Sequence, residues 1–548
     1  MAGRVALDAS SVVRCRRRVH LDHDPTAVHN PRAEPDPALE QRRMDAAAHR
    51  AEIGSRLAAL AGADWVATSD GSAHERERAT SAALAGGARY VWNAVLPRDH
   101  GGARFGEVDL LVRADGGGYR PVIVVRHRVT DPGSGALTGP FGLPEVALAT
   151  VDPARRARSQ PRDQLRLAHL TRMLGSLGEA ADGPALGGVI GLDADVVLWH
   201  DLSAPNWPGG RDTLREYDAR FADRLAVAGA AAAGKPALAQ PSRITECRRC
   251  PWWPTCDAVL TARRDVSLVL RGEDAMALRA AGVDTVAALA ALDPAGEPPV
   301  PLNGMPFPDA VALARAYQRG LPLVRRVAEV KVPRADVELD VDMESFSESG
   351  AYLWGCLLST PSGVDIGVDV GYHAFATWDP LPTIDEARSF AEFWVWLSAL
   401  RERCAQRGLS FAAYCYNEQA ENRWLLSSAD RFAGRPGIPT PDEVTAFISS
   451  DAWVDLFAVV SEWFLCAQGK GLKRIAPAAG FAWHDPDASG ENSMRWYRAA
   501  VGMDGEPPDP SQRDRLLRYN SDDVHATHAL REWMCSPGLA DVPLAAEL

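Results

Sequence analysis

One stretch of the chain places several acidic side chains at a spacing that suits a metal-binding strand. Residues 337–346 alternate apolar and acidic types, which is the period of a half-buried β-strand. Residues two apart in a strand point to the same face, so Asp340, Asp342 and Glu344 share one face. Carboxylates this close repel one another, and when partly buried they need a divalent cation or shared protons. The alternative is an edge strand whose acidic face is solvated.

Two later segments carry further acids with polar or aromatic neighbours. One contains Asn417 and Glu421 directly after an apolar, strand-like run. The other contains Tyr519 and Asp523, which are four residues apart on an expected helix and therefore face the same way. Together with the acidic strand, they supply candidate metal ligands from three separate parts of the chain.

These three blocks, in this order and spacing, resemble the DnaQ-type, RNase H-like 3′–5′ exonucleases. In that family four acids hold two metal ions, and a Tyr or His lies four residues before the last acid. The resemblance implies that Asp342, Glu344, Glu421 and Asp523 bind two Mg²⁺ or Mn²⁺ ions and that Tyr519 is the aromatic partner. One departure is visible. The middle block of the family usually carries Asp after an aromatic residue, whereas here the longer Glu421 follows an alanine.

The same resemblance implies a hydrolytic reaction at a nucleic-acid end. Two cations about 4 Å apart would lower the pKa of a water and stabilise the leaving 3′ oxygen. Tyr519 would orient that water or help to deprotonate it. Asp455 is a reserve ligand, and Lys470, Lys473 and Arg474 form a small basic patch suited to phosphates.

The first part of the chain resembles a second kind of nuclease. An acid-bearing helix, a strand with Gly106-x-x-Asp109, an apolar strand and a helix that begins near Gln164 follow one another as in RecB-like PD-(D/E)XK nucleases. In that family the acid corresponding to Asp109 binds metal with an acid of the next strand, where a Lys orients the water. Here that strand offers no acid, and Arg126 stands in place of the Lys.

This departure predicts a weakened or inactive first site, because Arg keeps its proton and presents a planar fork rather than a point charge. We expect the site to be kept for binding a phosphate backbone, for which Arg126 and Arg128 are suited. The alternative is an active endonuclease that uses Glu52 and Asp109.

Three cysteines lie within ten residues, as Cys247-x2-Cys250-x5-Cys256. This is metal-ligand spacing, and three thiolates need a fourth partner to complete a zinc site or a four-iron cluster. RecB-like nucleases with an iron–sulfur cluster take one cysteine from near the N-terminus, and Cys15 fits that pattern. The resemblance therefore implies a 4Fe-4S cluster on these four residues. Zinc, or reduced cysteines without metal, are the alternatives.

Length and composition set the domain organisation. The chain has 548 residues, a formal net charge of −13, 46% apolar residues and 24% charged residues, which predicts two to four domains with real cores. We expect an α/β protein with a PD-(D/E)XK-like domain over 1–265, a helical segment over 266–330 and an RNase H-like domain over 331–548. The helical segment weakly resembles a helix-hairpin-helix half around Gly282.

The expected function follows from both resemblances, since the whole chain resembles RecB-family nucleases that fuse the two units. We expect a metal-dependent 3′–5′ exonuclease that acts on DNA or RNA, with DNA the favoured substrate, in DNA repair or nucleic-acid turnover. No signal peptide or membrane span is evident, so we expect a cytoplasmic protein without disulfides. The alternative is a non-catalytic iron–sulfur protein that binds or scaffolds nucleic acid.

Overall fold

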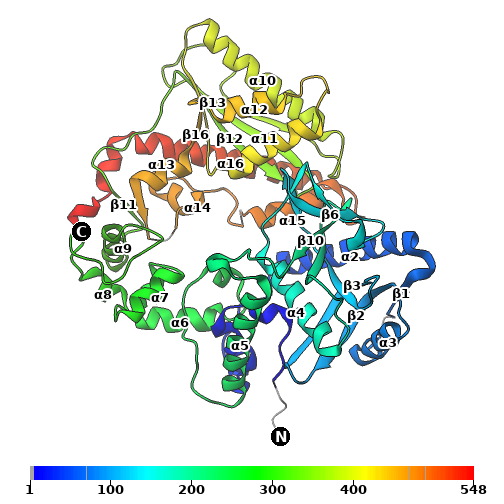
Figure 1. Cartoon of the computed structure of the whole chain (residues 1–548). Coiled ribbons are helices and arrows are strands. Elements are labelled where there is room, and N and C mark those ends of the chain that lie inside the picture. The colour runs from blue at the N-terminus through cyan, green and yellow to red at the C-terminus, as the bar shows by residue number, and fades with distance from the viewer. Residues whose placement is uncertain (1–4, 69–70, 468, 488) are drawn as a thin grey trace. The chain divides into compact units, whose positions relative to one another are not determined.

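The computed structural model describes residues 5–68, 71–467, 469–487 and 489–548 (Figure 1). The chain divides into two compact units, residues 1–259 and residues 260–548. Both units combine helices with β-sheets, which confirms the expected α/β class. The expected helical segment over 266–330 lies within the second unit. No helix among the described residues is both long and apolar enough to cross a membrane.

The first unit is built on a mixed eight-stranded sheet. In sheet order its strands are β1 (Trp65–Ala67), β2 (Tyr90–Asp99), β3 (Arg104–Arg113), β4 (Tyr119–Val124), β9 (Leu186–Ile190), β10 (Val196–Asp201), β6 (Ala136–Pro140) and β7 (Thr150–Asp152). Strands β2, β3 and β4 are antiparallel, and β4 pairs in parallel with β9. A small antiparallel pair, β5 (Thr130–Pro132) and β8 (Arg155–Ala157), lies outside this sheet.

The helices of the first unit are α1 (Arg16–His23), α2 (Pro37–Ala61), α3 (Ala73–Ala85), α4 (Pro161–Leu177), α5 (Thr213–Ala232) and α6 (Trp253–Arg263), whose last residues begin the second unit. Apolar residues of α4 and α5 pack with those of β3 and β4 in one core cluster. Helix α1 packs against α5, so the start of the chain lies beside residues more than 200 positions later.

The second unit begins with three helices, α7 (Glu273–Ala280), α8 (Val286–Ala290) and α9 (Phe307–Gln318). A five-stranded sheet follows. In sheet order its strands are β14 (Gly371–Ala376), β13 (Ala351–Ser359), β12 (Val337–Ser345), β15 (Phe411–Cys415) and β16 (Trp453–Asp455). The acidic strand β12 is central: it pairs antiparallel with β13 and parallel with β15. A two-stranded sheet, β11 (Leu323–Arg325) and β17 (Phe464–Cys466), completes the strands.

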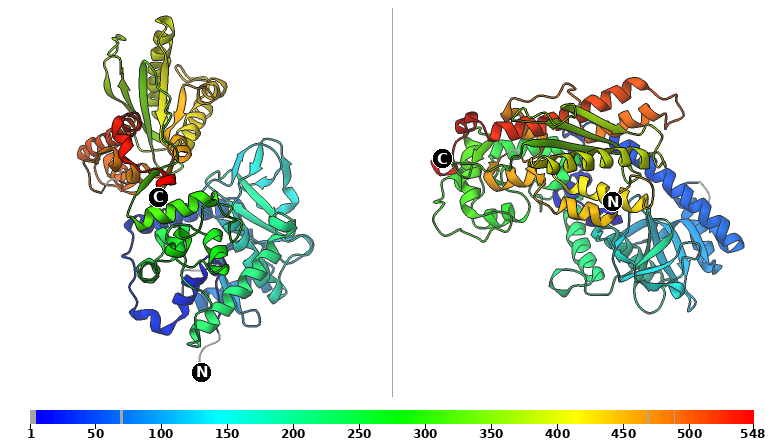
Figure 2. Two further views of the ribbon diagram at one scale, coloured as in Figure 1. Left: turned by 90° about the vertical axis from the view of Figure 1, so that its left-hand side faces the viewer. Right: turned by 90° about the horizontal axis from the view of Figure 1, so that it is seen from above.

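Helices cover both faces of the five-stranded sheet, as the left view of Figure 2 shows. On one face α10 (Glu386–Gln406) buries its aromatic residues against the apolar side of β12 and β13. On the other face α16 (Pro510–Met534) lies along the acidic side of β12. The shorter helices among the described residues of this unit are α11 (Gln419–Arg431), α12 (Pro441–Ile448), α13 (Leu456–Trp463), α14 (Leu472–Ile475) and α15 (Gly490–Val501).

The alternating sequence of β12 explains this arrangement. Leu339 and Val341 are fully buried under α10, while the acids between them point to α16. Helix α16 begins at Pro510, whose fixed φ suits the first helical position, and the side chain of Asp509 accepts a hydrogen bond from the backbone of Ser511. The sheet and α16 thus bring acids that are about 180 residues apart to one place.

Candidate functional site

Four acids follow one another along the α16-facing side of β12, and they divide into two pairs. Glu338 and Asp340 are both fully buried, and both are bound by Arg531 of α16. Arg531 lies 2.9 Å from Glu338 and also contacts Asp340, and its guanidinium stacks over the ring of Tyr414. Asp340, which the strand pattern groups with Asp342, therefore belongs to a buried ion-pair cluster.

The second pair, Asp342 and Glu344, meets Asp523 of α16. One ligand oxygen from each of these three carboxylates lies within 4.8 Å of the others. Glu344 and Asp523 are buried, and Asp342 is partly buried. Oxygen ligands this close and this sheltered fit a hard divalent cation. Within the described residues, this is the group of three that has the spacing of a metal site.

The electrostatics of the three carboxyls show the cost of leaving them without a cation. Burial, together with the charge of Asp523, raises the pKa of Glu344 to about 8. Burial and the charges of Asp523 and Glu344 raise the pKa of Asp342 well above its usual value. The pKa of Asp523 is raised by burial, although Lys473 and the indole of Trp483 oppose the shift. A divalent cation would compensate the negative charges and so remove the repulsion between the ionised carboxylates.

Glu421, the fourth expected ligand, lies near the group but outside its 4.8 Å spacing. It occupies the first turn of α11, is 5% exposed, and one of its carboxylate oxygens has no hydrogen-bond partner. Burial raises the pKa of Glu421 to about 8, and its charge also raises the pKa of Asp342. An unsatisfied buried carboxylate oxygen beside three other acids fits a second cation.

Asp455, the reserve ligand of the sequence interpretation, is used differently. It ends β16, and its side chain accepts hydrogen bonds of 2.8 Å from the backbone N–H groups of Phe457 and Asn417. It therefore caps α13 and fixes the loop that leads to Glu421. This is a structural role next to the acidic group.

Asn520 holds Asp342 in place and was not singled out by the sequence. Its amide donates to the carboxylate of Asp342 over 2.8 Å, and its own oxygen accepts from the hydroxyl of Tyr372 over 2.7 Å. Helix α16 comes this close because Gly355 of β13 faces it without a side chain. A Cβ at Gly355 would lie 1.5 Å from the Asn520 oxygen.

We therefore expect Gly355→Ala to displace Asn520 and to misplace Asp342. The substitution should destabilise the second unit by about 1–3 kcal/mol, as overpacking does, and should weaken Mn²⁺ binding. Thermal unfolding with and without Mn²⁺ measures both effects. Gly490→Ala is the matched control, because a Cβ there meets no atom within 4 Å. Equal behaviour of the two variants would contradict the packing argument.

Tyr519 reaches the site from the turn of α16 that precedes Asp523. Its hydroxyl accepts a hydrogen bond from Lys473 over 3.1 Å, and its ring meets Trp496 edge-on. Burial and the neighbouring charges of Glu344 and Asp523 raise the pKa of Tyr519 far above its usual value. A hydroxyl in this environment keeps its proton at neutral pH, so its chemistry is that of an orienting group rather than of a base.

Two residues of the segment before α15, Trp483 and His484, form hydrogen bonds with acids of α16. Trp483 donates from its indole to Asp523 over 2.6 Å, and the next residue, His484, donates to Asp522 through its backbone over 2.9 Å. Neither Trp483 nor Asn520 has a spacing that reveals its role in the sequence. They follow from the tertiary packing alone.

The comparisons with known proteins bear on this unit. Residues 434–535 match the family model described as the RNase H superfamily. The second unit thus carries an RNase H superfamily segment. The matched segment contains Tyr519, Asn520 and Asp523, while Asp342 and Glu344 precede it. No curated protein and no solved structure matches the chain. The match supports a nuclease-type function in general, and with it a nucleic-acid substrate.

In the first unit Asp109 is bound by protein groups on all sides. Its carboxylate accepts hydrogen bonds from Arg50 over 2.5 Å, from Arg166 over 3.1 Å and from the backbone N–H of Val124 over 2.8 Å. Glu52, the other acid considered there, has a side chain that is 65% exposed and lies 3.9 Å from Arg56. Two guanidinium groups therefore occupy the surroundings in which a cation would bind Asp109.

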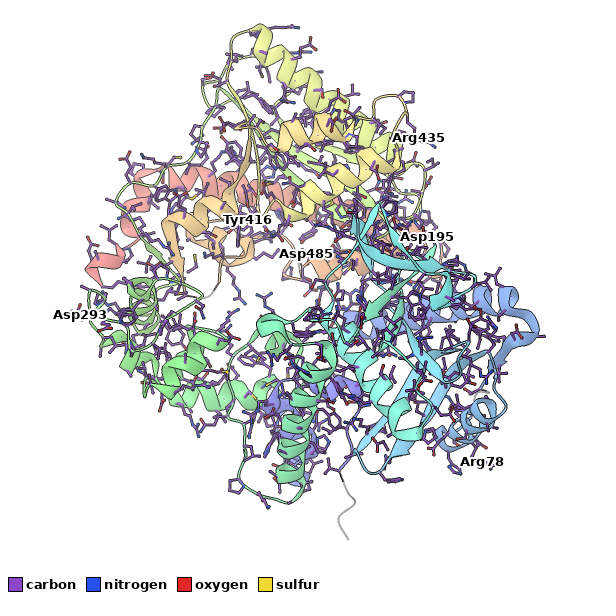
Figure 3. The ribbon with its side chains drawn as sticks, in the orientation of Figure 1. Arg78, Asp195, Asp293, Tyr416, Arg435 and Asp485 are labelled. Carbon is purple, nitrogen blue, oxygen red and sulfur yellow. The ribbon has the colours of Figure 1, made fainter. Side chains whose placement is uncertain are left out.

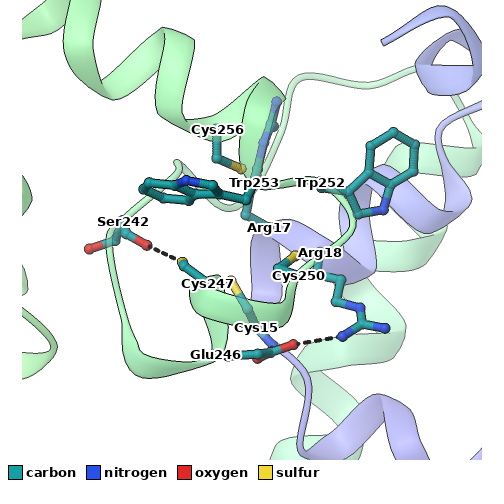
Figure 4. A pocket seen from close by; sticks show the side chains of 10 residues that line it. All are labelled: Cys15, Arg17, Arg18, Ser242, Glu246, Cys247, Cys250, Trp252, Trp253 and Cys256. Atoms are coloured by element: carbon teal, nitrogen blue, oxygen red, sulfur yellow. Dashed lines mark hydrogen bonds and ion pairs between the residues drawn. The ribbon is translucent and has the colours of Figure 1, made fainter. Parts of the chain in front are cut away.

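The four expected cysteines line one cavity of the first unit, which Figure 4 shows from close by. Cys15 comes from the start of α1, and the other three come from residues 247–256. The backbone N–H of Cys15 donates to Glu246 over 2.7 Å, and Arg18 pairs with the same carboxylate over 3.1 Å. These contacts hold the two ends of the unit together.

The thiols of this cavity fit a metal group. Burial raises the pKa of Cys250 to about 11 and that of Cys256 to about 12. Without a cation, the thiols of Cys250 and Cys256 would thus stay protonated, whereas binding of a metal ion would favour their thiolate forms. No three of their sulfurs lie within 4.8 Å of one another, while a zinc ion with bonds of about 2.3 Å needs sulfurs about 4 Å apart.

Proposed function

We propose that the second unit is a metal-dependent 3′–5′ exonuclease that hydrolyses phosphodiester bonds of DNA. The observation that carries this proposal is the group of three sheltered carboxylates, Asp342, Glu344 and Asp523, with ligand oxygens within 4.8 Å. Such a group has little use without a divalent cation, and it lies in a unit with an RNase H superfamily segment. This combination favours phosphodiester hydrolysis over nucleic-acid binding alone.

Asp342, Glu344 and Asp523 would hold one cation, and Glu421 would join Asp342 in holding a second. Mg²⁺ or Mn²⁺ at such carboxylates supplies a more acidic water and stabilises negative charge on the phosphate and on the leaving 3′ oxygen. The reaction adds one water across the phosphorus–O3′ bond, so a nucleotide with a 5′ phosphate leaves and the shortened strand keeps a 3′ hydroxyl.

The chain's own residues position this reaction. Asn520 fixes the carboxylate of Asp342, and Trp483 fixes that of Asp523, so neither acid is free to rotate away. The hydroxyl of Tyr519 orients the attacking water, since the raised pKa of Tyr519 keeps this hydroxyl protonated at neutral pH and so unable to take up the water's proton.

An end-labelled substrate tests this proposal. Purified protein with Mn²⁺ should shorten a single-stranded oligonucleotide that carries a 5′ label, one nucleotide at a time, and a blocked 3′ end should stop it. Matched DNA and RNA oligonucleotides decide the substrate, and we expect DNA to be cut faster. If the protein shifts the oligonucleotide in a gel but cleaves it with neither Mg²⁺ nor Mn²⁺, the scaffold alternative replaces the exonuclease.

For the first unit we propose a site that binds but does not cut. Arg50 and Arg166 already compensate the charge of Asp109, and the following strand supplies no second acid. Their guanidinium groups, with those of Arg126 and Arg128, suit a phosphate backbone instead. Any cleavage by the full chain should therefore be independent of Asp109.

We also propose that Cys15, Cys247, Cys250 and Cys256 hold a 4Fe-4S cluster with a structural role. The resemblance to RecB-like nucleases that carry an iron–sulfur cluster, with Cys15 from the start of the unit and three cysteines from its end, favours a cluster over a single zinc ion. Protein purified without oxygen should be brown, with visible absorption that zinc protein lacks. Cys256→Ser should lose this absorption, while Cys535→Ser, at an exposed cysteine of the second unit, should keep it. A colourless protein that contains stoichiometric zinc would contradict the cluster.

A further inference from the structure

Lys473 is placed at the acidic group by a short helix and its anchors. It lies in α14 (Leu472–Ile475), after β17. The hydroxyl of Tyr416 (Figure 3), just after β15, donates to the backbone carbonyl of Lys470 over 2.5 Å and so ties this segment to the central sheet. The ammonium nitrogen of Lys473 lies 3.1 Å from the Tyr519 hydroxyl and 4.4 Å from the centre of its ring.

The second aromatic neighbour of Lys473 is Trp483, the residue that holds the side chain of Asp523. The ammonium nitrogen of Lys473 lies 5.6 Å from the ring of Trp483, the residue that donates to Asp523. Aromatic faces attract a cation without neutralising it. Two rings and one hydroxyl therefore fix the position of the Lys473 charge, and no direct ion pair of Lys473 is found among the described residues.

This charge acts on the metal-binding acids but is not paired with one of them. Lys473 lowers the pKa of Asp342, Glu344 and Asp523 against the larger effect of their burial. Its hydrogen bond, however, goes to the neutral hydroxyl of Tyr519 rather than to a carboxylate. An ammonium group has three N–H donors, so in the described structure this contact leaves two for a ligand.

The charge balance of the site indicates what that ligand is. Four carboxylates would match the charge of two dications, so among these groups the charge of Lys473 would remain to attract an anion. A phosphodiester linkage carries one negative charge and offers oxygen acceptors that suit an ammonium group. If Lys473 served only to compensate the negative charge of the acids, it would have no role once the cations compensate that charge.

We propose that Lys473 binds the scissile phosphodiester of the substrate and that the hydroxyl of Tyr519 positions it for this contact. The proposal rests on the function proposed above, and it adds a substrate-binding residue that is not a metal ligand. In this proposal Lys473 binds the negatively charged phosphate of the substrate, and the three acids bind the metal ion.

The test uses the full chain with Lys473→Met, which keeps the length of the apolar stem, and Lys473→Arg, which keeps the charge. Lys331→Met is the matched control, since Lys331 is an exposed lysine of the second unit that lies outside the basic patch. Oligonucleotide affinity is measured by fluorescence anisotropy with Ca²⁺ in place of Mn²⁺, over a series of salt concentrations. Mn²⁺ affinity is measured separately, by titration of the protein without nucleic acid.

We expect Lys473→Met to weaken oligonucleotide binding about tenfold or more, the effect of one charge-assisted hydrogen bond. The slope of log affinity against log salt should fall by about 1, because one phosphate contact is lost. Mn²⁺ should bind the variant as tightly as the wild type or more tightly, since a repelling charge has gone. Lys473→Arg should recover most of the oligonucleotide affinity, and Lys331→Met should change it less than threefold.

Two outcomes would overturn the proposal. Unchanged oligonucleotide affinity and salt slope in Lys473→Met would show that Lys473 does not contact phosphate. Loss of Mn²⁺ binding together with a lower melting temperature in both Lys473 variants would show that the residue only supports the fold. Failure of the exonuclease is a separate result: a wild-type protein that never cuts, but whose affinity falls in Lys473→Met, keeps the phosphate contact and loses the proposed reaction.

Discussion

Replacing Asp342 with Asn should lower the cleavage rate by about a thousandfold or more while raising the stability of the metal-free protein. The amide has the shape of the carboxylate and can still accept the hydrogen bond from Asn520. It exchanges one carboxylate oxygen for an NH2 group and removes one negative charge from the three carboxylates that would hold the cation, and charge stabilisation of this kind contributes several kcal/mol to phosphoryl transfer.

The gain in stability has a separate cause. The charges of Asp523 and Glu344, together with burial, disfavour the ionised form of Asp342 and raise its pKa. Folding therefore becomes less favourable as the pH rises from the unfolded value towards the folded pKa, and Asn removes this penalty. Single-turnover cleavage with Mn²⁺ and thermal unfolding in a chelator measure the two effects. Clustered acids that are suited to binding a metal ion thus lower the stability of the metal-free protein.

Asp340→Asn is the informative control, because Asp340 lies on the same face of β12 and is held by Arg531. It should behave in the opposite manner, with a lower melting temperature and a cleavage rate close to that of the wild type. If Asp342→Asn cleaves as fast as the wild type, no hydrolytic centre exists at the acidic group. A loss of activity in Asp340→Asn alone would place the centre about two turns further along α16.

The comparison between Asp340 and Asp342 shows what the sequence of the second unit could and could not predict. Period-two alternation correctly places the acids of β12 on one face, because strand geometry is local. Which acids remain for metal depends on Arg531, almost 200 residues later, and no local pattern reveals that contact. Asn520 and Trp483 were missed for the same reason.

The first unit shows the same limit. The missing acid and the Arg126 substitution are visible in the sequence and predict a weakened site, but the two arginines that bind Asp109 become evident only in the structure. Cys15 was assigned to the cysteine group by resemblance, not by spacing. The packing of α1 against α5 supplies the physical reason, since it brings the start of the unit to its end.

Arg531→Met should strongly destabilise the second unit while leaving the proposed metal ligands intact. It removes the shared partner of Glu338 and Asp340, which are both fully buried, and breaking such a cluster costs about 3–5 kcal/mol. Arg334 still pairs with Glu338 over 2.6 Å, so Asp340 would bear most of the loss. The melting temperature of this unit should fall by roughly 10 °C.

The loss should depend on pH with a definite sign. Burial would raise the pKa of Glu338, but the hydrogen bonds from Arg334 and the charge of Arg531 outweigh burial and hold that pKa below its usual value. A lowered carboxyl pKa stabilises the folded state above the unfolded pKa, and the stabilisation disappears as the pH falls through the folded pKa. The difference between Arg531→Met and the wild type should thus be largest at neutral pH and shrink towards pH of about 4.

Two further variants separate this buried cluster from ordinary ion pairs. Arg388→Met removes an exposed arginine that pairs with Asp385 and Glu392, and it should cost less than about 1 kcal/mol. Adding Glu338→Gln and Asp340→Asn to Arg531→Met should restore most of the lost stability, because the stranded charges are then gone. If Arg531→Met unfolds no more easily than Arg388→Met, Arg531 does not neutralise the two acids. The division of β12 into a structural pair and a metal-binding pair would then be wrong.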